Sequence, residues 1–335
     1  MSRPHPTEFM ARIAVTDGMA PDAVALLTDS GHEVVEQFIT MDDLKGGALS
    51  KFDAIIIRSA TKLPEEVITA SEGLKVIGRA GVGVDNIDLK AAGAAGIPVV
   101  NAPRASTQSV VELTIAHLLS SLRHITTSDR GMRQGLWEKK AMKGTELSGK
   151  RLGLIGFGRI AQGVCSVAQA IGMEVHAFDP YLPPKVAKEM GVDLHKKVDT
   201  LFKTCTHISV HCNLTPETHH LINEQRIALM PGVSPDGLAC GNHIVNCARG
   251  GIVDEDAVLQ ALESGALASA ALDVFEHEPI TGDEPLLQHR NFHGTPHIGA
   301  ATIEAQARVG RDIANAVMMV LNGEDCPTVV NKQFL

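Results

Sequence analysis

The stretch Gly153-Leu-Ile-Gly156-Phe-Gly158-Arg-Ile-Ala161 decides the fold. It follows an apolar run typical of a buried strand and opens a run with helical periodicity. Gly156 allows a tight turn, and Gly158 allows the backbone to approach a pyrophosphate at the N-terminus of the helix. The third glycine position of this pattern is Ala161, whose methyl group can pack against the sheet. Such a pattern alone is often only a tight turn, so its setting between strand and helix is what favours a phosphate-binding loop.

An acidic residue follows the next predicted strand. Residues 174–178 are expected to be extended, and Asp179 comes directly after them, eighteen positions beyond Ala161. A carboxylate in that place accepts hydrogen bonds from the hydroxyls of an adenosine ribose and repels a 2′-phosphate. The spacing therefore favours NAD over NADP, with an ordinary strand-end aspartate as the alternative.

Strands and helices alternate along most of the chain, an order that implies βαβ units and parallel sheets. We expect strands at 12–15, 32–38, 53–57, 74–78, 97–101, 151–155, 174–178, 207–212, 243–248, 268–275 and from 292 to before Pro296. We expect helices at 21–31, 64–70, 88–95, 160–171, 184–190, 223–229, 254–264 and 302–321. Between the two series, 109–112 resembles a capping box ahead of a helix to Leu122, and 131–149 is expected to be a surface loop around Trp137. The chain therefore has two α/β domains, and the final helix can return to pack on the first.

Composition narrows the function classes. The 335 residues are enough for about two domains, and 44% of them are apolar. A net charge of -9 and 3% aromatic residues argue against nucleic-acid binding. No apolar run is long enough to span a membrane, and the first ten residues lack the apolar core of a signal peptide. The six cysteines form no CxxC pair, which indicates buried thiols in a cytoplasmic protein rather than a zinc or disulfide framework.

Three of the later predicted strands end in groups suited to acid–base chemistry: Arg249, Glu278 and His297. In a doubly wound sheet, ligands bind beyond the carboxyl ends of the strands, so these side chains can converge. An imidazole can take a hydroxyl proton near neutral pH, a carboxylate beside it favours the imidazolium, and a guanidinium can bind a carboxylate. The set fits hydride transfer from a 2-hydroxy acid. Each residue alone is weak evidence for a catalytic site, because the chain has 15 histidines and a charged residue at the end of a strand is often only solvated.

Longer blocks of sequence resemble the D-isomer-specific 2-hydroxyacid dehydrogenase family. The matching blocks are 58–62 (RSATK), 78–86 (GRAGVGVDN), 137–140 (WEKK), 144–150 (GTELSGK), 246–254 (NCARGGIVD), 271–275 (ALDVF) and 296–300 (PHIGA). The resemblance implies two doubly wound parallel-sheet domains. A Rossmann-type NAD-binding domain would span 105–298, and a flavodoxin-like substrate-binding domain would combine 1–104 with 299–335. It also implies a homodimer, formed through the nucleotide-binding domain, or a dimer of dimers.

The same resemblance assigns roles to individual residues. It makes Arg249 the substrate-binding arginine, Glu278 the partner carboxylate and His297 the acid/base. The implied NAD site contains Gly156, Gly158, Arg159, Ile160, Asp179, Cys212, Cys247, Ala248, Asp273 and Gly299. The implied substrate residues of the other domain are Arg58, Ser59, Arg79, Val82 and Gly83. No metal is expected. Val82 is a departure, since a threonine is familiar there in the members that act on phosphorylated substrates.

The resemblance is strongest to members that oxidise 3-phosphoglycerate to 3-phosphohydroxypyruvate at the head of serine synthesis. A small, phosphorylated 2-hydroxy acid is therefore the expected substrate, and Arg58 and Arg79, both after predicted buried strands, suit its second anionic group. The alternatives are glyoxylate or hydroxypyruvate, lactate and sulfolactate as substrates, or a dinucleotide-sensing protein like the corepressors of this superfamily. A chain ending at Leu335 leaves no room for a C-terminal regulatory domain, so feedback by serine is not expected. The loop 232–242 receives no function.

Overall fold

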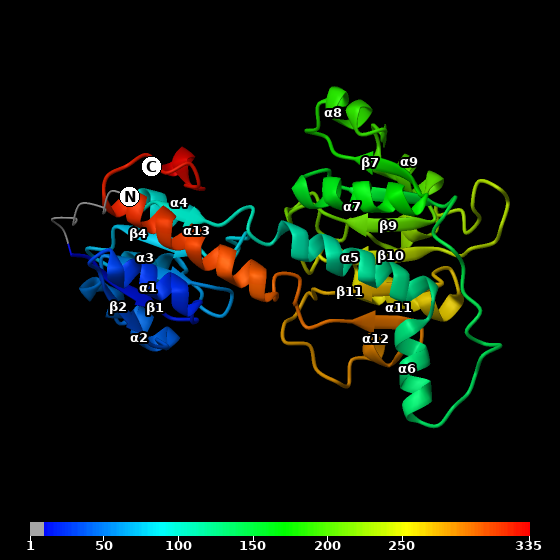
Figure 1. The fold of residues 1–335 in the computed structure, drawn as a ribbon, viewed down its shortest axis with the longest axis horizontal. Helices are drawn as coiled ribbons and strands as arrows, with labels where there is room; N and C mark the ends of the chain where they lie inside the picture. Colours follow the sequence, from blue (N-terminus) through cyan, green and yellow to red (C-terminus); the bar gives the residue numbers. More distant parts are fainter. Residues whose placement is uncertain (1–9) are drawn as a thin grey trace. The chain divides into compact units, whose positions relative to one another are not determined.

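The computed structural model describes residues 10–335 and divides the chain into two compact units (Figure 1). One unit combines Met1–Ser106 with Ala300–Leu335, and the other is Thr107–Gly299. Each unit is an α/β structure with its own parallel sheet, which confirms the predicted fold class. No helix within residues 10–335 has the length and apolar character that crossing a bilayer requires.

The first unit is built on a five-stranded parallel sheet in the order β2-β1-β3-β4-β5, the flavodoxin-like order. Its strands are β1 (Arg12–Val15), β2 (Glu33–Glu36), β3 (Ala54–Ile57), β4 (Val76–Arg79) and β5 (Val99–Asn101). Its α-helices are α1 (Pro21–Asp29), α2 (Met41–Lys45), α3 (Glu65–Thr69), α4 (Leu89–Ala94) and α13 (Ile303–Leu321). Two short 3₁₀ turns, Ala48–Lys51 and Lys332–Phe334, complete it.

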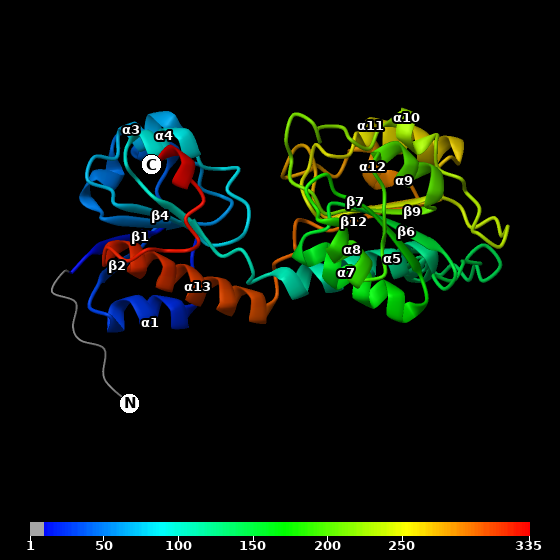
Figure 2. The ribbon, with the colours of Figure 1, turned by 90° about the horizontal axis from the view of Figure 1, so that it is seen from above.

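The C-terminal helix α13 returns to this first sheet, as the sequence suggested. Figure 2 shows α13 beside α1 on one face of the sheet, with α3 and α4 on the other. Ile313 and Val317 of α13 are fully buried in one cluster with Ile13 and Ile56. At Gly78 a β-carbon would lie 2.8 Å from Val317 Cγ2, so a glycine in β4 is what lets the helix approach this closely.

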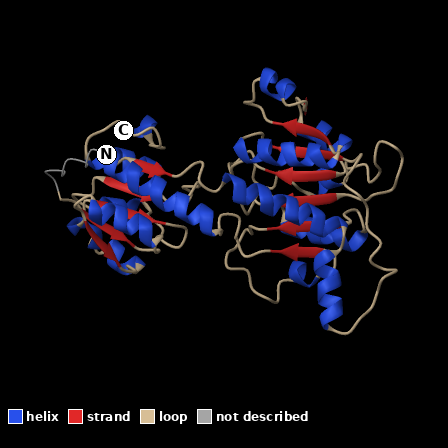
Figure 3. Ribbon diagram, viewed as in Figure 1, coloured by secondary structure: helices blue, strands red, loops and turns tan. Residues whose placement is uncertain are grey.

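The second unit is built on a seven-stranded parallel sheet in the order β12-β11-β10-β9-β6-β7-β8 (Figure 3). Its strands are β6 (Arg151–Ile155), β7 (Glu174–Phe178), β8 (Asp193–Leu194), β9 (His207–Val210), β10 (His243–Asn246), β11 (Ser269–Leu272) and β12 (Phe292–Gly294). Its helices are α5 (Thr107–Leu122), α6 (Ile125–Arg133), α7 (Arg159–Ile171), α8 (Pro184–Glu189), α9 (Val198–Thr204), α10 (Glu224–Ile227), α11 (Glu255–Ser264) and α12 (Pro285–Gln288). From β6 the chain adds β7 and β8 on one side of the sheet and then β9 to β12 on the other side. This is a Rossmann-type sheet, and its topological switch point lies between β6 and β9.

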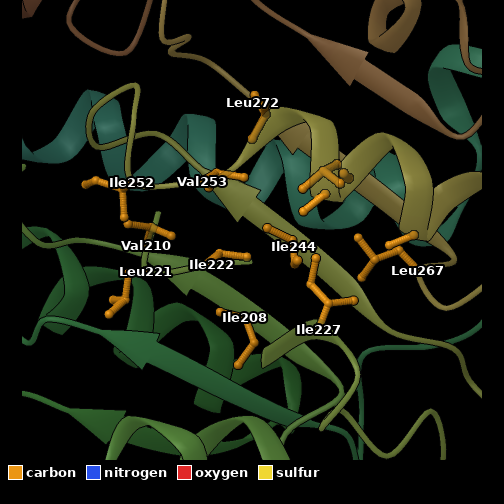
Figure 4. Close-up of a cluster of buried hydrophobic side chains, with 14 of the residues drawn as sticks. Ile208, Val210, Leu221, Ile222, Ile227, Ile244, Ile252, Val253, Leu267 and Leu272 are labelled. Atoms are coloured by element: carbon orange, nitrogen blue, oxygen red, sulfur yellow. The ribbon is translucent and has the colours of Figure 1, made fainter. Parts of the chain in front are cut away.

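Both faces of the second sheet are covered, so its central strands β9, β10 and β11 are buried along their whole length. Figure 4 shows one of the two apolar layers, in which Ile208, Ile244 and Leu272 come from three neighbouring strands. Ile227 of α10 and Leu267, which follows α11, lie in the same cluster. Burial on two faces explains why these strands read as apolar runs rather than as an alternating pattern.

The predicted elements are present, with ends within three residues of the expected positions. The capping box was wrong: α5 begins at Thr107, so 109–112 lies inside the helix. Residues 131–133 were expected in a loop but are the end of α6, a helix in which no residue is buried. Four short elements were not predicted: α2, β8, α9 and α12.

Candidate active site

The loop between β6 and α7 has the geometry of a phosphate-binding turn. Gly156 has φ +85°, and a β-carbon there would lie 2.8 Å from the carbonyl oxygen of His211, so only glycine fits. At Gly158 no described atom lies within 4 Å of the place a β-carbon would take. Within residues 10–335 no side chain caps the first turn of α7. The open space and the helix N–H groups therefore fit a pyrophosphate.

Asp179 lies against this loop from the end of β7. Its Oδ2 accepts a hydrogen bond from Phe157 N at 2.9 Å, and its Oδ1 accepts one from Tyr181 N at 2.9 Å. Two backbone donors fix the carboxylate at the rim of the glycine loop, while each oxygen keeps a further acceptor site. The position suits contact with a ribose.

The other residues expected at the cofactor site surround the same edge of the sheet. Arg159 is exposed and Ile160 is half-buried at the start of α7, while Cys212, Cys247 and Ala248 follow β9 and β10. Burial raises the pKa of the Cys212 thiol to about 11 and that of Cys247 to about 12. Both cysteines are thus neutral packing groups rather than nucleophiles.

His297 and Glu278 are in direct contact. His297 Nδ1 lies 2.8 Å from Glu278 Oε2, and Glu278 Oε1 accepts a hydrogen bond from Phe275 N at 3.0 Å. A carboxylate can only accept, so the proton of this bond belongs to Nδ1 and leaves Nε2 directed elsewhere. Both side chains are partly exposed, at 45% and 36%. This arrangement presents one ring nitrogen to a ligand and orients it through the other.

Asp273 holds the turn that carries His297. It is 1% exposed, and its carboxylate accepts hydrogen bonds from Thr295 Oγ1 (2.5 Å), Ile298 N (2.8 Å) and Gly299 N (2.8 Å). His297 has φ +52°, a left-handed conformation that costs a non-glycine residue roughly 1–3 kcal/mol. Asp273 and Gly299 were expected in the cofactor site, and their mutual hydrogen bond gives both a part in shaping the His297 turn.

Arg249 lies three residues beyond β10, half-buried, and its Nη1 donates to Ala248 O at 2.6 Å. Asn246 fixes this segment, because its Oδ1 accepts from Ala248 N and its Nδ2 donates to Arg249 O, both at 2.9 Å. At Gly250 a β-carbon would lie 1.8 Å from Phe275 O. The arginine loop therefore packs on the backbone that leads to Glu278.

Arg58 and Ser59 lie on the loop after β3 in the first unit. Asp17 Oδ2 accepts from Arg58 N at 2.7 Å and from Thr61 N at 3.0 Å, and Asn86 Nδ2 donates to Arg58 O at 2.7 Å. Two polar side chains thus hold the loop, with Ser59 exposed on it.

Arg79 is the last residue of the neighbouring strand β4, and Val82 and Gly83 lie on the loop after it. Arg79 is half-buried and its Nη1 donates to Ala80 O at 3.2 Å, while Val82 is 37% exposed. Asn101 Nδ2 donates to Val82 O at 2.6 Å. The five expected substrate residues therefore lie at the end of β4 and on two adjacent loops at the carboxyl edge of the first sheet, where ligands of such sheets bind.

Sequence reasoning missed the residues that hold these loops in shape. Asn246 stood inside a quoted block, and an asparagine directly before a turn is a recognisable signal for side-chain bonding to the backbone. The contact between His117 and Thr295 has no such signal, because these two residues are 178 positions apart in the sequence.

The comparisons with known proteins agree with this fold. The family model "D-isomer specific 2-hydroxyacid dehydrogenase, NAD binding domain" matches residues 115–299. The chain belongs to this family, and NAD is the cofactor of the matched domain.

Individual relatives give more detail. D-3-phosphoglycerate dehydrogenase of Methanocaldococcus jannaschii is 46% identical over 96% of this chain, which spans 60% of that protein's length. Hydroxypyruvate reductase of Thermotoga maritima is 43% identical over 92% of this chain and 98% of that protein. The solved structure of the TT0316 protein from Thermus thermophilus matches with a TM-score of 0.86 at 32% identity, over 95% of this chain and 99% of that one. These relatives share the family and differ in the substrate their names give.

Proposed function

We propose that this chain catalyses the NAD-dependent oxidation of 3-phosphoglycerate to 3-phosphohydroxypyruvate, at the head of serine synthesis in the cytoplasm. The observation that carries the proposal is the 2.8 Å contact of His297 with Glu278 at the carboxyl edge of a NAD-binding sheet. Relatives named D-3-phosphoglycerate dehydrogenase, at 46% and 40% identity, support the substrate.

The proposed mechanism assigns one task to each residue. His297 Nε2 takes the proton of the substrate hydroxyl, and Glu278 stabilises the imidazolium that results. Arg249 binds the substrate carboxylate by a two-point fork. NAD, when bound, supplies the hydride acceptor. Gly156 and Gly158 leave room for its pyrophosphate, and Asp179 would accept the ribose hydroxyls and disfavour a 2′-phosphate.

In this proposal Arg58 and Arg79 bind the phosphate group of the substrate. A guanidinium matches two phosphate oxygens, and local positive charge offsets the acidic character of the chain. We expect Arg79→Ala to raise the KM for 3-phosphohydroxypyruvate about 10- to 150-fold and the KM for hydroxypyruvate far less. Equal losses on both substrates would place Arg79 in loop structure instead.

A second candidate is the reduction of hydroxypyruvate. Its support is the Thermotoga maritima enzyme, which this chain matches over 98% of that protein's length, whereas it matches 60% of the Methanocaldococcus jannaschii one. A panel of 3-phosphohydroxypyruvate, hydroxypyruvate, glyoxylate, pyruvate and sulfopyruvate, each assayed with NADH and NADPH, separates the candidates. The highest kcat/KM for the phosphorylated acid with NADH is the expected result. A higher value for hydroxypyruvate would select the second candidate, and no turnover at all would favour a dinucleotide-sensing role.

We also propose a homodimer formed through the second unit. None of the nine residues of α6 is buried, and Ile125, Met132, Leu136 and Trp137 are exposed at 52%, 61%, 47% and 81%. Met132, Leu136 and Trp137 line one surface pocket, and exposed apolar side chains that gather in this way mark an interaction site. Light scattering after size-exclusion chromatography should give twice the chain mass for the wild type, and Trp137→Ser should shift the population towards the monomer.

A further inference from the structure

We propose that His117 and Thr295 form, together with Asp273, a buried hydrogen-bond chain that positions the turn carrying His297. His117 Nε2 lies 3.1 Å from Thr295 Oγ1, and Thr295 Oγ1 lies 2.5 Å from Asp273 Oδ1. His117 comes from α5, Thr295 follows β12 and Asp273 follows β11. Both new members act through Asp273 and are positioning residues, and the inference rests on the acid/base role proposed for His297.

The direction of each hydrogen bond follows from counting protons. A carboxylate can only accept, so the single hydroxyl proton of Thr295 points at Asp273. Thr295 therefore accepts from His117, and His117 must carry a proton on Nε2. Burial lowers the pKa of His117, which is 3% exposed, although the charge of Asp273 opposes this. The neutral Nε2–H form thus completes the chain at neutral pH.

The chain matters because Asp273 is buried and holds a strained turn. A buried carboxylate must have its acceptor sites satisfied, and one of its three donors is the Thr295 hydroxyl. Without that donor the carboxylate can rotate away from the N–H groups of Ile298 and Gly299. The left-handed backbone of His297 then loses the contacts that offset its cost, and the imidazole moves relative to Glu278.

His293 provides a matched control inside the same cluster. Its ring lies 5.0 Å from that of His117, and burial lowers its pKa to about 4. Its Nε2 is buried and has no hydrogen-bond partner among residues 10–335. His293 therefore shares the surroundings of His117 but has no link to Thr295 through this nitrogen.

Two substitutions at Thr295 separate a hydrogen bond from packing. Thr295→Val keeps the shape and removes the hydroxyl, whereas Thr295→Ser keeps the hydroxyl and removes the methyl group. We expect Thr295→Val to lower kcat about 10- to 100-fold with little change in the KM for the keto acid, because misplacing a reacting group by about 1 Å costs that much. Thr295→Ser should retain a kcat near that of the wild type. The reverse order, or two equal losses, would mean that Thr295 only fills space.

His117 is tested in the same way, and independently of the folding of the Thr295 variants. His117→Leu should lower kcat about 2- to 10-fold, the value of one neutral hydrogen bond, and His117→Gln should restore part of it through its amide donor. His293→Leu should leave kcat unchanged. Equal effects of His117→Leu and His293→Leu would overturn the proposal.

A structural readout keeps this inference separate from the proposed function. Crystal structures of the wild type and of Thr295→Val should show the His297 Nδ1 to Glu278 Oε2 contact intact in the first and lengthened in the second. An intact contact in Thr295→Val would disprove the positioning chain whatever the substrate. A lengthened contact combined with full activity of His297→Ala would support the chain and disprove the acid/base role of His297.

Discussion

Two pairs built on histidine lie at opposite ends of the second sheet. His297 and Glu278 follow β12 and β11 at the carboxyl edge, partly exposed and 2.8 Å apart. His207 and His243 are the first residues of β9 and β10, paired in register, with ring centroids 4.6 Å apart and exposures of 0% and 4%. His297 has a carboxylate partner and is partly exposed. His207 and His243 are buried and have no carboxylate partner among the described residues. The same side chain is therefore arranged for proton transfer at one edge and for packing at the other.

The largest expected effect comes from breaking the carboxyl-edge pair. His297→Ala should lower kcat by about 10²- to 10⁴-fold, because it removes the proposed acid/base, while NADH still binds. Steady-state kinetics and NADH fluorescence titration measure the two quantities. The matched change at the amino edge, His243→Ala, should instead lower the unfolding temperature. A His297→Ala enzyme with full kcat would contradict the assignment.

Lowering the pH should destabilise the folded protein through the amino-edge pair, His207 and His243. Burial lowers the pKa of His243 to about 4 and that of His207 well below its ordinary value, so both are neutral when folded. The unfolded chain binds these protons below a pH of about 6.5, so the folded state is fully favoured above that pH and loses stability as the pH falls towards 4. For His243 alone the loss is on the order of 3 kcal/mol.

Urea unfolding of the second unit at pH 7.5 and pH 5 measures this loss. Equal stability at both pH values would mean that the buried rings are protonated or that the sheet opens before they titrate.

The contrast between the two edges also shows what a sequence can reveal. The strands, the glycine loop and the placement of Arg249, Glu278 and His297 at one edge of the sheet were predictable, because parallel strands gather their carboxyl ends there. The left-handed turn at His297 was not, since it depends on Asp273 rather than on local preference. Helix α6 was not predicted either, because only two of its nine residues, Ile125 and Met132, are large and apolar.

A smaller effect is expected from changing the partner of His297 while keeping its shape. Glu278→Gln should move the pH dependence of kcat/KM to lower pH, because the imidazolium loses its neighbouring charge. Glu276→Gln is a close control: Glu276 Oε1 bonds His220 Nε2 at 2.7 Å rather than His297. An unchanged profile in Glu278→Gln, or an equal shift in both variants, would reduce Glu278 to a loop charge.

The smallest effect should follow from replacing a ring in the buried pair by a hydrocarbon ring. His207→Phe keeps a flat ring against His243 and removes Nε2, which is buried without a hydrogen-bond partner among residues 10–335. It also leaves Thr206 Oγ1 without its 2.8 Å contact to His207 Nδ1. Removing an unsatisfied polar atom gains about 1–3 kcal/mol, while the lost hydrogen bond and the larger ring cost a comparable amount. The free energy of unfolding at pH 8 should therefore change by less than about 1 kcal/mol, and the loss between pH 7.5 and pH 5 should shrink because one titrating ring is gone. A loss of several kcal/mol at pH 8 would show that the contact of His207 Nδ1 with Thr206 Oγ1 outweighs the gain from removing Nε2, and the amino-edge pair would then be more than packing.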